Sequence, residues 1–220
     1  MVSELELRVA WEAHVVGDTA WFDRVLDLHR EPHRRYHGVG HVGWVVRHVL
    51  DLAARHAARV ADLGAVVAAA FFHDAVYDPT RSDNEAVSAA LARRALDELG
   101  WPTERAGAVA GLILATAGHT AVSDPGGSLD TAVLLAADLA VLAAEPASYA
   151  EYVTGVRAEY AHVGDADWAA GRGRVLTGLI ARPAIYDPAL ELATWERRAR
   201  GNIAAELSGL HRASGGVSDG

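Results

Sequence analysis

Apolar residues recur at steps of three and four positions through most of the chain, and runs that alternate apolar with polar residues are few. The first spacing places apolar side chains on one face of an α-helix, whereas strict alternation is typical of a half-buried strand. Alanine, leucine and arginine are abundant, and all three have high helix propensity. The pattern therefore predicts an all-α protein.

The expected helices cover most of the chain. We place them at 4–29, 40–57, 59–77, 83–99, 103–117, 129–144, 147–162, 167–181 and 189–210. Prolines lie between these stretches, where the restricted ring and the missing N–H donor interrupt no helix. Since no linker marks a boundary, we expect one domain over 1–210, a bundle of roughly eight or nine helices. We expect the polar tail at 211–220 to be disordered.

Composition excludes several classes of protein. The 220 residues are 51% hydrophobic, enough for one helical domain with a sizeable core. Cysteine is absent, so disulfides and thiol nucleophiles are excluded, and any metal must take nitrogen and oxygen ligands. Lysine is absent too, which excludes the Gly-Lys-Ser/Thr phosphate loop of P-loop nucleotide-binding proteins.

Charge and hydropathy bear on partners and location. The net charge of −9 argues against a nucleic-acid polymer as a partner, although a local arginine cluster can still hold a phosphate. The N-terminus has acidic residues where a secretory signal has a basic region followed by an apolar one. Apolar runs are interrupted before they reach the length of about 18 residues that suggests a membrane span. We therefore expect a cytoplasmic protein that binds no membrane.

Polar residues interrupt three of the most apolar helices. His73 and Asp74 end the apolar run 65–72, Asp138 stands in the middle of the run 132–142, and His41 begins an apolar helix. Burying a carboxylate without a partner lowers the stability of the fold by roughly several kcal/mol. Each of these positions therefore needs an explanation. A lone buried histidine bonded to a carbonyl, or an aspartate capping a helix, is the more common explanation for one residue. Three helices with such a group favour a shared metal ion.

The candidate ligands are two imidazoles and two carboxylates. This set of nitrogen and oxygen ligands suits a divalent ion such as Mn, Fe, Co, Ni, Zn or Mg. The segments around the ligands are Arg35-Tyr36-His37-Gly38-Val39-Gly40-His41-Val42, Phe71-Phe72-His73-Asp74-Ala75-Val76-Tyr77-Asp78, Asn84-Glu85-Ala86-Val87-Ser88-Ala89, Thr116-Ala117-Gly118-His119 and Ala137-Asp138-Leu139. In this order and setting they resemble the HD superfamily of metal-dependent phosphohydrolases, in particular a bacterial branch of predicted HD hydrolases.

The resemblance implies an all-helical HD fold and a divalent metal held by His41, His73, Asp74 and Asp138. It also implies hydrolysis of a phosphomonoester or phosphodiester through attack by metal-activated water. We expect the substrate to be a small phosphorylated metabolite, such as a nucleotide.

Further residues are candidates for catalysis and binding. Besides Asp74, we expect Glu85 near a helix start to orient water or relay a proton; an exposed helix-start glutamate is the alternative. His119 is a candidate phosphate donor, general acid or ligand of a second metal, or a helix-end histidine that complements the helix dipole. His37 precedes His41 by four residues; we prefer His41 as the ligand and His37 as a substrate contact, although the roles can be reversed.

Phosphate also requires a cation besides the metal, and arginine is the basic residue available. Arg34, Arg35 and Arg157 are the candidates, with a structural ion pair to Glu159 or another carboxylate as the favoured reading of Arg157. Two other functions compete with hydrolysis. One is a di-iron HD oxygenase, which needs more histidines than the single His119 between Asp74 and Asp138; the other is a non-catalytic module that binds metal or nucleotide.

Overall fold

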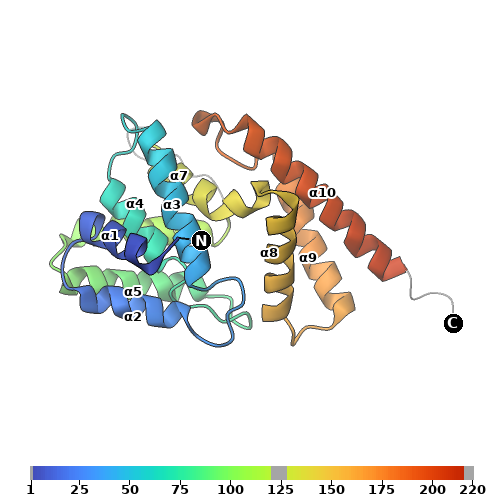
Figure 1. Cartoon of the computed structure of the whole chain (residues 1–220), viewed down its shortest axis with the longest axis horizontal. Helices are drawn as coiled ribbons and strands as arrows, with labels where there is room; N and C mark the ends of the chain where they lie inside the picture. The colour runs from blue at the N-terminus through green and yellow to red at the C-terminus, as the bar shows by residue number, and fades with distance from the viewer. Residues whose placement is uncertain (1, 120–127, 216–220) are drawn as a thin grey trace. The chain divides into compact units, whose positions relative to one another are not determined.

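The computed structural model describes residues 2–119 and 128–215, and the side chains of these residues up to 212. Within these ranges the chain forms ten α-helices and two short 3-10 helices, with no strand, so the all-α prediction is confirmed (Figure 1). In the same ranges, no single helix has both the length and the apolar content to cross a membrane. One bent helix pair, Asp130–Ala143 with Pro146–Glu159, passes that test by length and composition alone.

The chain divides into two compact units, Met1–Asp138 and Leu139–Gly220. The single domain expected over 1–210 stays a prediction. The boundary lies inside an apolar run and has no proline, glycine or polar linker to mark it. The helix expected at 129–144 is correspondingly divided into α7, Asp130–Asp138, and a 3-10 helix, η2, Leu139–Ala143.

The first unit is built around one apolar helix. It contains α1 (Glu4–His14), α2 (Thr19–His29), α3 (Val39–Arg55), α4 (Leu63–Phe72), α5 (Asn84–Glu98), α6 (Thr103–Thr116) and α7. All residues of α4 from Ala65 to Phe72 are buried, and α4 contacts α1, α3, α5, α6 and α7. Burying each large apolar side chain contributes about 1.5–3 kcal/mol, so α4 is the centre of this unit's core.

The helix expected at 4–29 is two helices, and this prediction was wrong for a local reason. Val16 and Gly17 have φ of 61° and 108°, outside the helical region, and Asp18 then caps α2 by accepting a hydrogen bond from the Ala20 N–H at 2.9 Å. Gly17 also lies close to Leu99, whose Cδ2 would be 2.8 Å from an added Cβ. The sequence Gly-Asp-Thr carried this signal of a helix end followed by a helix start.

The helix expected at 59–77 is shorter at both ends. Asp62 caps α4 by accepting a hydrogen bond from the Ala65 N–H at 3.0 Å, and His73 is the C-terminal cap. Asp74 therefore begins a non-helical segment that runs to the start of α5. His73 and Asp74 thus lie in the turn that follows the buried helix.

The second unit contains η2, α8 (Pro146–Glu159), α9 (Asp165–Ile180), the 3-10 helix η3 (Pro188–Leu190) and α10 (Ala193–Gly215). Within it α10 contacts η2 and α9, and Asn202 donates hydrogen bonds from Nδ2 to the carbonyl of Leu142, within η2, and to that of Ala144, just after η2. Arg172 and Glu206 form a buried ion pair at 2.8 Å. Because α10 continues to Gly215, residues 211–215 of the expected disordered tail are helical; 216–220 lie outside the described residues.

Candidate metal centre

The predicted ligands lie at the ends of three helices that pack against one another. His41 is in the first turn of α3, His73 caps the end of α4, and Asp138 is the last residue of α7. Each of these helices contacts the other two. Apolar packing therefore brings polar groups 97 positions apart in sequence, from His41 to Asp138, to one place.

Four polar atoms converge there. The Nε2 atoms of His41 and His73 are 3.1 Å apart, and Asp74 Oδ2 lies 3.5 Å from the first and 3.3 Å from the second. Asp138 Oδ1 lies 3.3 Å from His41 Nε2 and 3.6 Å from His73 Nε2. Both imidazoles are buried, and each carboxylate side chain is at most 16% exposed.

The distances fit a metal ion. Nitrogen and oxygen ligands bind zinc and similar ions at about 2.0–2.2 Å, which places two adjacent ligands of one ion about 3.0–3.6 Å apart. The observed separations lie in that range. His41, His73 and Asp138 form a group that could hold a metal ion, and Asp74 presents a fourth oxygen to the same two nitrogens.

A hydrogen bond fixes the tautomer of one candidate ligand. His73 Nδ1 lies 3.0 Å from the carbonyl oxygen of Ala70, and since a carbonyl only accepts, Nδ1 carries the hydrogen. In the neutral ring Nε2 then has its lone pair directed at the cluster, as metal-binding histidines require. His41 Nδ1 is buried and makes no hydrogen bond to any described residue.

The electrostatics of the cluster favour a cation. Burial raises the pKa of Asp74, but His73 and His41 outweigh it and hold that pKa well below its usual value. The pKa of Asp138 is likewise raised by burial and lowered more strongly by His119, His41 and His73. Burial lowers the pKa of His41 and of His73, yet the two carboxylates raise both above the usual value. The two carboxylates thus favour protons on the two histidines, and a metal ion bound between these residues could replace those protons.

His119 contacts the cluster through Asp138. Its Nε2 is 2.7 Å from Asp138 Oδ2, so this oxygen faces His119 while Oδ1 faces His41 and His73. His119 has φ of 44°, a left-handed conformation that costs a non-glycine residue about 1–3 kcal/mol. The contact was not among the roles we expected for His119. It orients a carboxylate as the outer partners of metal ligands do.

His37 lies beside the cluster and outside the converging set. Its ring stacks on Tyr77 with centroids 4.2 Å apart, and its centroid is 5.4 Å from that of His41. The geometry therefore agrees with the choice of His41 as the candidate ligand. A substrate contact for His37 remains a prediction.

Glu85 lies in the first turn of α5 and is half-buried. Two neighbours on this helix, Asn84 and Ser88, bond to the segment after Asp74 and so fix the helix start near it. No hydrogen bond or ion pair joins the Glu85 carboxylate to a described residue of the cluster. Its role in proton transfer remains a prediction.

The three arginines are placed differently from one another. Arg34 was expected at a substrate site, but its side chain is 1% exposed and its guanidinium binds backbone carbonyls and Glu31. Arg35 is exposed and donates to the carbonyl of Pro32 at 2.7 Å. Arg157 belongs to the second unit, where it pairs with Asp165 at 2.7 Å. Its favoured structural reading agrees with this ion pair.

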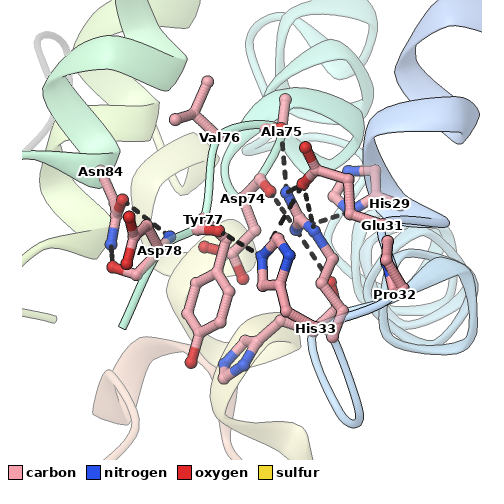
Figure 2. A network of polar contacts seen from close by, with 12 residues as sticks. His29, Glu31, Pro32, His33, Asp74, Ala75, Val76, Tyr77, Asp78 and Asn84 are labelled. Atoms are coloured by element: carbon pink, nitrogen blue, oxygen red, sulfur yellow. Dashed lines mark hydrogen bonds and ion pairs between the residues drawn. The ribbon is translucent and has the colours of Figure 1, made fainter. Parts of the chain in front are cut away.

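Several residues near the site escaped the sequence reasoning. His29 Nε2 lies 3.2 Å from the carbonyl oxygen of Phe71. His33 Nε2 lies 2.8 Å from the carbonyl oxygen of Tyr77 (Figure 2). Asn84 holds Asp78 by a pair of hydrogen bonds. Their partners are backbone atoms, which leave no residue pattern in the sequence.

Comparison of the chain with protein-family models, with curated proteins and with solved structures gives no match. The fold and the site therefore stand on the chain's own residues. What these define is an all-α protein whose first unit carries a buried histidine and aspartate cluster able to hold a metal ion.

Proposed function

We propose that the chain is a metal-dependent phosphohydrolase of the HD type that acts on a small phosphorylated metabolite, such as a nucleotide. The observation that carries the proposal is the convergence of His41 Nε2, His73 Nε2, Asp74 Oδ2 and Asp138 Oδ1 within 3.1–3.6 Å of one another along the measured pairs. The order of these residues along the chain, which resembles that of HD hydrolases, supports phosphoryl chemistry.

Those four residues would hold a divalent ion: Mn, Co, Ni, Fe, Zn or Mg. When bound, such an ion polarises a phosphoryl oxygen and lowers the pKa of water at the site. The chain's own groups fix the ligands: the Ala70 carbonyl orients His73, and His119 orients Asp138. His37, half-buried beside His41, is our candidate donor of a hydrogen bond to a phosphate oxygen, and the exposed Arg35 is our candidate cation.

Proton transfer requires a further group in the same unit. Glu85 is our candidate, since Asn84 and Ser88 on the same helix are bonded to the segment that follows Asp74. Glu85 lies in the first turn of α5, and a carboxylate is one of the side chains that transfer protons in general acid and base catalysis.

The test is a screen for phosphate release. The purified chain is supplied with Mn, Co, Ni or Mg and offered a panel of phosphorylated metabolites. Replacing Asp74 by Asn should lower the rate on the best substrate by on the order of 100-fold or more, because a candidate ligand is lost. Asp23→Asn is the matched control: Asp23 is exposed on α2, pairs with Arg8, and should leave the rate unchanged.

Three results would contradict the proposal. Phosphate release by folded Asp74→Asn protein at the wild-type rate would remove the site. Two irons per chain with oxygen consumption on substrate addition would indicate an oxygenase. Tight nucleotide binding with no turnover across the panel would indicate a binding module.

A further inference from the structure

The non-helical segment that follows the His-Asp pair is bound almost entirely by side chains. Five consecutive backbone carbonyls, those of residues 74–78, each contact a side-chain donor or a histidine ring nitrogen: Arg34 for Asp74 and Ala75, Ser88 for Val76, His33 for Tyr77 and Asn84 for Asp78. Figure 2 shows these contacts around Asp74, Ala75 and Tyr77. The position of Asp74 therefore depends on groups outside its own helix.

Arg34 makes the largest contribution to this arrangement. NH1 donates to the carbonyls of Asp74 at 2.7 Å and His37 at 2.9 Å, and NH2 donates to the carbonyl of Ala75 at 3.1 Å. Nε and NH2 both donate to Glu31 Oε2, at 3.1 Å and 3.0 Å. A guanidinium has five N–H donors, and these contacts use every one of them.

The contacts join two segments that carry candidate ligands. The carbonyl of His37 lies in the loop that enters α3, one turn before His41, and the carbonyl of Asp74 belongs to a candidate ligand itself. One guanidinium group thus sets the separation between these two segments. The planar fork fixes the directions of both bonds, which the flexible ammonium of lysine, with three donors, cannot do.

The charge of Arg34 is buried, and it is stabilised by Glu31 and by the three carbonyls to which the guanidinium donates. A buried charge carries a desolvation cost that a hydrophobic residue of similar size avoids, and pairing with Glu31 offsets it only in part. Glu31 itself is 39% exposed. Such a group is well suited to fix one geometry of the backbone around it.

We infer that Arg34 is a positioning residue that holds the His37–His41 loop and the Asp74 turn in the register that the metal centre needs. The inference rests on the proposed function only in that it requires the cluster to bind a metal. Arg34 itself touches none of the four candidate ligand atoms.

The test measures metal binding directly, by titration of the metal-depleted full chain with Co²⁺ and recording of the cobalt visible absorption. Arg34→Lys should weaken Co²⁺ binding about 10–100-fold, the range found when outer partners of metal ligands are removed, and should alter the absorption bands. Arg105→Lys is the matched control. Arg105 lies in the same unit and makes two charged hydrogen bonds to Asp62, so its loss affects stability and should leave cobalt binding unchanged.

Circular dichroism establishes that each variant is folded. If Arg34→Lys does not fold, Glu31→Gln replaces it, because this change keeps Arg34 and removes the charge that pairs with it. Cobalt affinity and absorption equal to wild type in the folded variant would overturn the inference. Wild-type protein that binds no Co²⁺, Mn²⁺ or Zn²⁺ would instead overturn the proposed function.

Discussion

His29, at the end of α2, is a buried histidine kept neutral by its surroundings. It is 2% exposed, its Nε2 contacts the carbonyl of Phe71, and its Nδ1 lies 3.4 Å from Arg34 NH1. Burial, with the nearby charge of Arg34, lowers the pKa of His29 from 6.5 to about 3. Since a carbonyl only accepts, Nε2–H donates to Phe71, and in the neutral ring Nδ1 carries the lone pair that faces Arg34.

This neutral histidine predicts a loss of stability in mild acid. Below pH 6.5 the unfolded chain takes up a proton at His29 that the folded chain refuses until about pH 3, so stability falls as pH falls through that window. At about 1.4 kcal/mol per pH unit, the change from pH 6.5 to 5 lowers the free energy of unfolding by roughly 2 kcal/mol. Urea unfolding of metal-depleted protein at both pH values measures it.

The quantity to compare is the difference between wild type and His29→Gln, which cannot titrate. His41 and His73 have raised pKa values and act in the opposite sense, giving stability that is present at low pH and lost as pH rises. They are common to both proteins. Equal pH dependence in the two would contradict the role of His29.

The sequence allowed us to predict the polar residues whose burial is costly. It did not allow us to predict the side chains that form hydrogen bonds with backbone carbonyls. His41, His73, Asp74 and Asp138 stood out because apolar helices carry them. We expected Arg34 to bind phosphate, because the sequence does not distinguish an arginine that binds backbone carbonyls from one that binds phosphate. The difference lies in tertiary contacts.

At the scale of elements, the junction between α1 and α2 depends on a glycine. Gly17 combines φ of 108° with a close approach to Leu99, whereas Gly100, after α5, has φ of 79° and nothing within 4 Å of an added Cβ. An alanine at Gly100 would meet backbone strain alone, whereas an alanine at Gly17 would meet both backbone strain and steric crowding. Helix periodicity continued through Gly17, which is why the break was not predicted.

Alanine at each position should therefore have different costs. Gly100→Ala should lower the free energy of unfolding by about 1–2 kcal/mol, the cost of a left-handed alanine. Gly17→Ala should cost about 1 kcal/mol more, since its Cβ would lie 2.8 Å from Leu99 Cδ2. Urea denaturation of the two variants tests this order. Equal losses would mean that Leu99 moves aside without cost.

For the whole molecule, the main feature is that all candidate ligands belong to the first unit. A ligand that binds only the folded state stabilises it by about 2.7 kcal/mol at a concentration 100 times its Kd. The second unit has a separate buried network, in which Arg172 and Tyr149 each bond to Glu206. The sequence did not predict this division, because residues 132–142 are apolar on both sides of Asp138 and contain no linker.

Metal binding should therefore protect the two units unequally. With saturating Mn²⁺, hydrogen exchange measured by mass spectrometry should slow at amides of α3, α4 and α7, and should be unchanged in α8, α9 and α10. Asp138→Asn supplies the control, since the effect should vanish with this candidate ligand. Equal slowing in both units would show that they open together.

The side-chain contacts to residues 74–78 also have a consequence for how this region tolerates change. Every residue type has a backbone carbonyl, so substitution of Ala75 or Val76 leaves the bond acceptors in place. Inserting or deleting one residue would instead move each carbonyl away from its donor on Arg34, Ser88 or Asn84. The length of this segment is therefore under stricter constraint than its composition, and variants with altered loop length should lose the site while many single substitutions keep it.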